Sequence, residues 1–260
     1  MPLKYATGRE PHSPQQIASL RERHAYCGAA ATVETVVQPI ARIRDQKATP
    51  SCVGQACAAA VHALSGFDGS AIDLWTDARR RQGDLSDPSS GTTAELAIES
   101  LIHRGLDPYE SGEEDRTKAE LSKMPTLANE IEADDMRISP IAKRYLVVGT
   151  VAKQRLAIVE ALKSGHAVLW ATGVKDSFFN LGFDEIANSN HIGADDNGHE
   201  MRIVGYDAIT DEYLVQNSWS GSWGGCTFQG DEYPGCFRVR AVDALNGAWD
   251  TMILELKRAS

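Results

Sequence analysis

Small apolar residues fill the segment from Cys52 to Leu64, and this run constrains the fold more than any other part of the chain. Its second part is almost entirely apolar: Cys57, Ala58, Ala59, Ala60, Val61, Ala63 and Leu64. A helix that is apolar on nearly every face has to be buried on all sides. Gly66 follows the run and favours a helix end there. The sequence therefore predicts a central helix that other elements enclose.

Helix signals dominate the first half of the chain, and strand signals dominate the second. Further helices are predicted over 72–82 and 92–104, each followed by a glycine, and a short one from Ser13 to about Arg23. The second half has one helix, over 154–163, and strands over 145–148, 167–171, 200–206, 213–216, 236–239 and 251–256. Helices followed by strands are typical of an α+β chain with two lobes. We predict an N-terminal arm (1–32), a helical lobe (33–142) and a β-rich lobe (143–260).

Composition and charge limit the possible partners. The chain has 260 residues and a formal net charge of −10, so nucleic acid and anionic membranes are not expected to bind it. Its one dense basic run, Arg79–Arg81, is expected to be the solvated end of a helix. No long apolar span or secretory signal is seen, and this favours a cytoplasmic protein. The oligomeric state is not indicated.

The five cysteines do not form a recognisable disulfide framework. They are Cys27, Cys52, Cys57, Cys226 and Cys236, and an odd number leaves at least one thiol free. Cys226 and Cys236 flank a short loop, and the sequence leaves open whether they pair. Cys57 is expected to be a small core residue.

Cys52 lies where a helix is expected to begin, after Pro50 and Ser51. Unpaired N–H groups and the helix dipole favour an anion at that end. A thiol becomes an effective nucleophile as a thiolate. The position therefore predicts that Cys52 is an activated nucleophile, whereas a buried structural cysteine is the simpler alternative.

Two polar residues downstream suit a role as partners of such a thiol. His199 follows Gly198 at the start of one apolar strand, and Asn217 follows another strand and precedes Trp219. An imidazole can store the proton and deliver it to a leaving amine. A carboxamide can accept a hydrogen bond from the second ring nitrogen, and Trp219 can shield that bond. Gln46, in the loop before Cys52, could add an oxyanion-hole donor beside the Cys52 N–H.

Taken together, these motifs resemble the papain-like (C1 family) cysteine peptidases. The resemblance covers roughly residues 35–257. It lies in Gln46-x5-Cys52, in Gly198-His199-x5-Gly205-Tyr206 and in the string from Tyr213 through Asn217-Ser-Trp219 to Trp223-Gly. It implies a papain-like two-lobed α+β fold with a β-barrel-like second lobe and a substrate cleft between the lobes. It also implies peptide hydrolysis through a Cys52–His199–Asn217 triad and a thioester acyl-enzyme.

The resemblance further suggests how a protein or peptide substrate would bind. Gly91, within Ser90-Gly91-Thr92, is a candidate for pairing with an extended peptide, since a glycine permits close approach. Gly198 and Trp219 are the other candidate substrate-binding residues. An apolar pocket beside Gly198 is expected to set specificity. Neither a cofactor nor a metal is expected.

Several positions depart from the usual family pattern. Thr49 stands where a disulfide-bonded cysteine is usual, Val53 where an aromatic residue is usual, and Lys47 where a glycine is usual. The arm is too short for the long folded pro-region of secreted members, but it could still occlude the cleft. These features resemble a divergent bacterial or viral branch.

Three other functions compete with peptide hydrolysis. The same triad could catalyse another acyl transfer, such as transamidation or isopeptide cleavage, or the fold could be a catalytically silent binding module. A metal site made by His191, Asp195, Asp196 and His199 is the third, and it is weak because the spacing is not specific. For the ion-pair mechanism we expect a bell-shaped pH profile, with Cys52 ionising on the acid limb and His199 on the alkaline limb.

Overall fold

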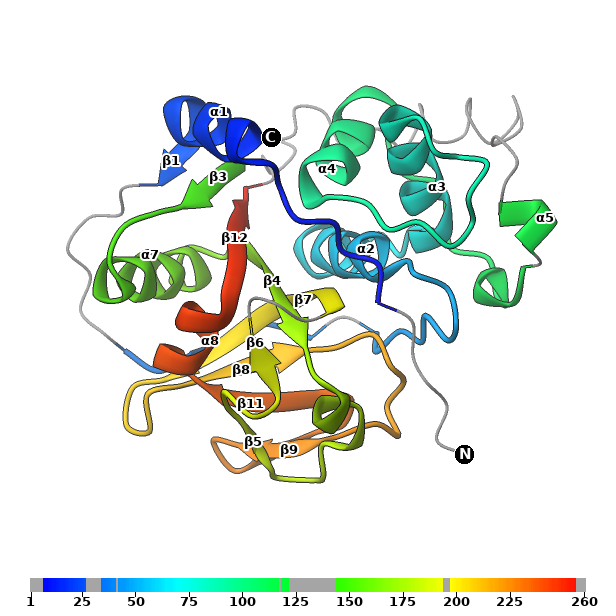
Figure 1. The fold of residues 1–260 in the computed structure, drawn as a ribbon. Helices are drawn as coiled ribbons and strands as arrows, with labels where there is room; N and C mark the ends of the chain where they lie inside the picture. The colour runs from blue at the N-terminus through cyan, green and yellow to red at the C-terminus, as the bar shows by residue number, and fades with distance from the viewer. Residues whose placement is uncertain are drawn as a thin grey trace.

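The computed structural model describes residues 7–26, 34–40, 42–116, 118–121, 144–193 and 197–255. Its helices are α1 (Pro14–His24), α2 (Cys52–Ser65), α3 (Ala71–Gln82), α4 (Ala94–His103), α5 (Lys118–Leu121), α7 (Val151–Lys163) and α8 (Ala241–Gly247), with 3-10 turns at Glu113–Asp115 and Asp176–Asn180. Its strands are β1 (Ala25–Tyr26), β2 (Val36–Val37), β3 (Arg144–Val147), β4 (Ala167–Val174), β5 (Ile186–Ala187), β6 (Ile192–Gly193), β7 (Asn197–Asp207), β8 (Glu212–Gln216), β9 (Cys226–Phe228), β10 (Asp231–Tyr233), β11 (Cys236–Arg240) and β12 (Ala248–Leu254). Figure 1 shows α2, α3 and α4 grouped beside the sheet.

The helix α2 is the buried centre of the helical part, as predicted. Its first ten residues are all buried, and it ends at Gly66, whose φ of 77° is the left-handed value that glycine adopts readily. Gly54 lets α3 approach closely: a Cβ at Gly54 would lie 2.2 Å from the carbonyl oxygen of Ala71. Small residues along α2 thus allow tight packing on both sides.

The main sheet has the strand order β1-β3-β12-β4-β7-β8-β11-β5, with β2 paired to β7 and β6 to β4. The two ends of this order are not joined by any pairing of the described strands, so the sheet is not closed into a barrel. The α+β class is confirmed. The predicted boundaries of the arm and the two lobes, after residues 32 and 142, fall outside the described residues.

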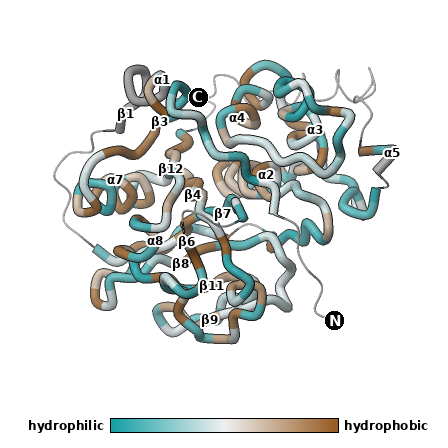
Figure 2. Tube along the Cα trace, viewed as in Figure 1, coloured by the Kyte–Doolittle hydropathy of each residue, from teal (hydrophilic) through white to brown (hydrophobic). Residues whose placement is uncertain are grey.

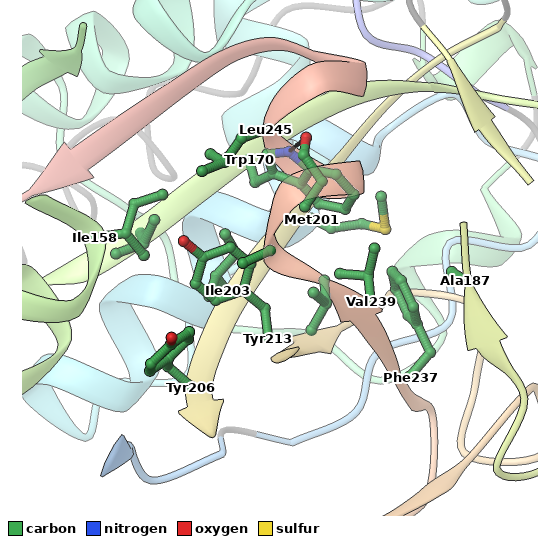
Figure 3. Close-up of a cluster of buried hydrophobic side chains, with 14 of the residues drawn as sticks. Ile158, Trp170, Ala187, Met201, Ile203, Tyr206, Tyr213, Phe237, Val239 and Leu245 are labelled. Carbon is green, nitrogen blue, oxygen red and sulfur yellow. Dashed lines mark hydrogen bonds between the residues drawn. The ribbon is translucent and has the colours of Figure 1, made fainter. Parts of the chain in front are cut away.

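The sheet has a hydrophobic core on each face. One core lies under α7 and α8 and contains Trp170, Ile203, Tyr213 and Phe237 (Figure 3). The other lies under α2 and α4, where Leu169 and Met252 of the sheet meet Val53 and Ala97 of the helices. Strand residues alternate between these two hydrophobic cores, as a pleated strand requires, and Figure 2 shows a hydrophobic stretch along β3.

The N-terminal arm lies across the molecule. The predicted short helix forms as α1, and its first turn is capped reciprocally: the Gln16 N–H donates to Ser13 Oγ at 3.2 Å, and the Ser13 N–H donates to Gln16 Oε1 at 2.7 Å. In Figure 1 the dark-blue segment before α1 passes close to the start of α2. This segment is hydrophilic in Figure 2, and it becomes important at the functional site.

One expectation about the helical part was wrong. Arg79 is not solvated but has no exposed surface. Its guanidinium donates to the carbonyl oxygens of Leu85, Asp87 and Leu121, and it lies 4.2 Å from the ring centroid of Trp75. Arg79 therefore stabilises the loop after α3, because the carbonyl oxygens of that loop satisfy its buried guanidinium.

The close approach of α2 and α3 can be tested with Gly54→Ala. The added methyl group has to displace the Ala71 carbonyl, and we expect the free energy of unfolding to fall by about 1–3 kcal/mol. Gly182→Ala is the matched control, because its nearest contact would be an ordinary 3.5 Å. Chemical denaturation of both variants measures the difference. Equal stability of the two would show that α2 and α3 are less tightly packed.

Candidate active site

Cys52 is the first residue of α2 and has no exposed surface. Its sulfur accepts hydrogen bonds from the backbone N–H groups of Glu200, in β7, and Gly8, in the arm. The predicted position at a helix start is therefore confirmed. The thiol lies against the backbone of the residue that follows His199.

In this conformation burial disfavours the thiolate form of Cys52. Burial raises the pKa of the Cys52 thiol to about 12, and the nearby Glu200 carboxylate adds to the increase. The two backbone hydrogen bonds and Arg9 lower the pKa by less. Because the loss of water outweighs the donors at the helix start, the thiol is neutral at physiological pH.

His199 and Asn217 are in direct contact. His199 Nε2 and Asn217 Oδ1 are 2.8 Å apart, and both residues are buried. The two strands that carry them, β7 and β8, pair side by side. Burial lowers the pKa of His199 to about 4, although the bond to Asn217 raises it in part. His199 Nδ1 makes no hydrogen bond to any described protein group.

Trp219 covers the His199–Asn217 pair, as predicted. The His199 and Trp219 rings are stacked, with centroids 4.6 Å apart and an interplanar angle of 28°. Phe179 stacks on Trp219 in turn, at 5.0 Å and 10°. These apolar rings exclude water from the carboxamide–imidazole hydrogen bond and fix the plane of the imidazole.

Gln46 connects the loop before α2 to the residue after Asn217. Its Nε2 donates to the Thr49 carbonyl at 3.0 Å, and its Oε1 accepts a hydrogen bond from Ser218 Oγ at 2.6 Å. The next residue, Lys47, has a φ of 51°, in the left-handed region. Its N–H is capped by Asp45 Oδ1 at 3.0 Å, so local hydrogen bonding supports a conformation that glycine adopts more readily.

The arm occupies the position that the sequence predicted for a peptide. The Thr92 N–H donates to the Gly8 carbonyl at 2.8 Å, the Glu10 N–H donates to the Thr92 carbonyl at 2.9 Å, and the Arg9 N–H donates to the Gly198 carbonyl at 3.1 Å. Arg9 and Thr92 form a parallel bridge. An extended segment of the chain is thus held between Thr92 and Gly198.

Glycine is required on both sides of this segment. A Cβ at Gly91 would lie 2.1 Å from the Gly8 carbonyl oxygen, and one at Gly198 would lie 2.2 Å from the Arg9 carbonyl oxygen and 2.3 Å from the Trp249 ring. No side chain fits at such distances. Gly91 thus permits the close approach of the arm itself, and its role in binding a substrate stays a prediction.

The side chain of Arg9 lies between two buried carboxylates. Its Nε donates to Glu200 Oε2 at 2.7 Å, and its Nη2 donates to Asp250 Oδ2. His12 Nδ1 lies 2.8 Å from the same Asp250 oxygen. We call Arg9, His12, Glu200 and Asp250 the Arg9 site. Beside Gly198 the structure places this ionic site together with the Trp249 ring, and the apolar specificity pocket stays a prediction.

The sheet register explains how the two carboxylates flank the guanidinium. Ala171 of β4 is opposite Glu200 of β7 on one side and opposite Asp250 of β12 on the other. The three residues form one row on one face of the sheet, and the outer two strands lie roughly 10 Å apart. The small Ala171 side chain leaves space above it, which the Arg9 side chain can enter.

Burial and charge compete within the Arg9 site. Burial raises the pKa of Glu200 to about 8, against the opposite effect of Arg9. Burial also acts to raise the pKa of Asp250, but Arg9 and His12 outweigh it and the net shift is downward. Burial would lower the pKa of Arg9, but Asp250 and Glu200 reverse this effect and raise it. The guanidinium is therefore a permanent cation there.

The remaining candidate residues are not brought into this site. Among the described residues there is no group of three or more His, Cys, Asp or Glu side chains that could hold a metal ion. Asp195 and Asp196 lie outside the described residues, and His191 lies 3.2 Å from Glu185. Cys57, Cys226 and Cys236 are buried free thiols, so the pair left open by the sequence is not bridged; Cys27 lies outside the described residues.

Comparison with known proteins gives a family and a fold. Residues 95–229, just over half of the chain, match the profile of the papain family of cysteine proteases. The match includes His199 and Asn217 and begins downstream of Cys52. No curated protein matches.

None of the described helices has both the length and the apolar character needed to cross a membrane.

Three solved structures illustrate the similarity of fold. Xylellain, a cysteine protease from Xylella fastidiosa, is 20% identical, covers 99% of this chain and 98% of its own, and has a TM-score of 0.76. The Carica candamarcensis cysteine protease CMS1MS2, in complex with E-64, is 18% identical over 84% of this chain and 94% of its own (TM-score 0.58). Bromelain from Ananas comosus, in complex with E64, is 15% identical over 87% and 100% (TM-score 0.62).

The pKa of Cys52 predicts a slow thiol in the intact chain. Because burial holds the thiolate form back until about pH 12, alkylation of Cys52 by iodoacetamide should stay slow from pH 6 to 9. Peptide mapping by mass spectrometry separates Cys52 from the other thiols, and the unfolded chain in denaturant gives the reference rate. Rapid alkylation of Cys52 at pH 7 in the folded chain would contradict this prediction.

Proposed function

This chain belongs to the papain family of cysteine proteases and is a cysteine-type peptidase, and we propose that Cys52, His199 and Asn217 form its catalytic triad. The observation that carries this proposal is the 2.8 Å contact between His199 Nε2 and Asn217 Oδ1 beneath Trp219. It leaves Nδ1 as the nitrogen that can exchange a proton with Cys52. The thiol lies against the backbone of Glu200, the next residue along β7.

The proposed reaction has two steps. Cys52 loses its proton to His199, and its sulfur attacks the carbonyl carbon of the scissile peptide bond. The C–N bond then breaks, His199 donates the proton to the leaving amine, and a thioester remains on Cys52. In the second step His199 takes a proton from water and the hydroxide attacks the thioester carbon. The C–S bond then breaks, His199 returns the proton to the Cys52 sulfur, and the carboxylic acid product leaves.

Gln46 and the helix start would stabilise the oxyanion. The Cys52 N–H belongs to the first turn of α2, where backbone donors have no partner within the helix. Gln46 Nε2 donates to the Thr49 carbonyl, in the loop that leads into α2. The Ser218 hydroxyl holds the carbonyl end of the same carboxamide and so fixes its orientation. A fixed donor costs no reorganisation when the oxyanion forms.

We also propose that this conformation is a closed state in which the arm covers the nucleophile. The arm offers Cys52 the N–H of Gly8, whereas a substrate has to offer a carbonyl carbon. The Gly8 carbonyl is turned away and accepts the Thr92 N–H. The arm therefore binds where a peptide would bind without presenting a bond to be cut. Displacing it would expose both Cys52 and His199 to water.

Labelling with an epoxysuccinyl peptide inhibitor tests the nucleophile and the arm together. We expect one adduct per chain, absent in Cys52→Ala. We expect it to form about tenfold faster or more in Arg9→Ala, because that change removes the two ion pairs that Arg9 makes with the sheet. Intact-mass spectrometry follows the rate. Glu10→Gln is the matched control, since the Glu10 side chain is exposed and its backbone contact is kept.

Two results would contradict these proposals separately. An adduct on a cysteine other than Cys52 would remove Cys52 as the nucleophile. Equal labelling rates in the wild type and in a chain that lacks residues 1–12 would show that the arm does not cover the site. Adding an amine nucleophile to the peptidase assay distinguishes hydrolysis from acyl transfer by the product formed.

Opening the arm should also restore a bell-shaped pH profile. Burial dominates both shifts, raising the pKa of Cys52 and lowering that of His199, so exposure moves the two pKa values back toward each other. In Arg9→Ala we expect kcat/KM to rise on the acid side as the Cys52 thiolate forms and to fall on the alkaline side as His199 loses its proton. A pH series on a fluorogenic peptide checks this, and a profile with one limb would contradict the ion pair.

A further inference from the structure

We infer that the Arg9 site is the specificity pocket of this peptidase and that it selects a basic side chain, arginine before lysine, in the substrate. The side chain would belong to a residue directly adjacent to the one that lies at Cys52, as Arg9 is adjacent to Gly8 in the arm. The inference rests on the proposed function, since it assigns the substrate class of the same site. It differs from the apolar pocket that the sequence suggested.

The position of the Arg9 site relative to the thiol supports this role. The Gly8 N–H contacts Cys52, and Arg9 is the next residue, so one residue separates the thiol from the side chain that enters the site. The arm is held there by backbone hydrogen bonds to Thr92 and Gly198. Backbone bonds do not depend on the side chains of the bound chain. Any extended chain held by the same groups would place a side chain where Arg9 now lies.

The acidic groups of the site belong to the sheet, whereas its basic groups come from the arm. Glu200 and Asp250 belong to β7 and β12, and their side chains are 0% and 3% exposed. Within the described part of the chain, the basic groups that act on these two carboxylates are Arg9 and His12, both from the arm. When the arm leaves, two carboxylates are left with no basic partner on the sheet. A basic side chain of the substrate would then pair with these acidic groups in place of Arg9.

The hydrogen-bonding capacity of the site favours arginine over lysine. Arg9 reaches Glu200 through Nε and Asp250 through Nη2, so one planar group spans both carboxylates. Glu200 Oε1 and Asp250 Oδ1 are buried and make no hydrogen bond within the described structure. A guanidinium has five N–H donors in a rigid plane, and an ammonium has three at one point. An apolar side chain would leave both buried carboxylates without a partner.

The first experiment measures selectivity in the full-length Arg9→Ala variant, whose arm no longer fills the site. The substrates are fluorogenic peptides that differ only in the selected residue: arginine, lysine, citrulline or leucine. Citrulline keeps the shape of arginine without its charge. We expect kcat/KM for arginine to exceed that for citrulline and leucine by about tenfold or more, because a site built for ionic hydrogen bonds rejects neutral analogues. Adding Glu200→Gln or Asp250→Asn should remove most of this preference, and adding Glu232→Gln, on exposed β10, should not.

The outcomes separate this inference from the proposed function. Hydrolysis of the leucine or citrulline peptide as fast as the arginine peptide overturns the basic pocket and leaves the peptidase intact. Hydrolysis of none of the peptides, together with no epoxysuccinyl adduct on Cys52, overturns the proposed function instead. In that case a second measurement, which needs no turnover, still decides the inference.

The second measurement uses the arm as the ligand. Full-length Arg9→Lys and Arg9→Leu are compared with the wild type by the rate at which iodoacetamide alkylates Cys52. We expect Arg9→Lys to stay within about threefold of the wild-type rate and Arg9→Leu to react about tenfold faster or more, because only a cation fills the site. The difference in alkylation rate between Arg9→Lys and Arg9→Leu should shrink when Asp250→Asn is added to both. If leucine at position 9 protects Cys52 as well as arginine does, the site is not selective for a basic side chain.

Discussion

The direct packing of α2 against β7 is the constraint on which the rest of the site depends. The start of α2 carries Cys52, and β7 carries His199 and Glu200, so this contact places the thiol against the backbone of the strand that carries the imidazole. Ala56 and Ala59 of α2 face Glu200 and Met201 of β7 across a small cavity. A larger side chain at either position would move the helix and separate the thiol from the strand.

Burial, rather than local charge, sets the chemical state of the covered site. The helix start and two backbone N–H groups favour the thiolate, yet the pKa of Cys52 rises to about 12 and that of His199 falls to about 4. Both shifts favour the neutral form, which is the form that a site without water supports. The same residues would form an ion pair only with water or substrate in place of the arm. Covering the site and keeping it chemically inactive are therefore one physical effect.

Local signals predicted most of the fold, and long-range register decided the part that they missed. The helices α2, α3 and α7, and the Cys52, His199 and Asn217 positions, follow from short motifs and from glycines such as Gly66 and Gly83. The acidic site has no such motif, because Glu200 and Asp250 are 50 positions apart and meet only through the register of β4 between them. For the same reason an apolar pocket was expected there. The burial of Arg79 has no local signal either, since its carbonyl partners lie in the loop after α3 and at Leu121 of α5.

In the proposed closed state the arm lies where a substrate would bind. The side chain that the arm places in the site therefore indicates which substrate side chain the site accepts. A segment that only covered the thiol could use any extended backbone, because Thr92 and Gly198 bind main-chain groups. This arm adds a fully buried arginine between two carboxylates, and burying a charge is unfavourable unless its partners are already in place. The partners belong to central strands of the sheet, whose positions are fixed by the core and not by the arm. The sheet thus supplies an acidic site in advance, and the arm occupies it with the side chain that the site binds best.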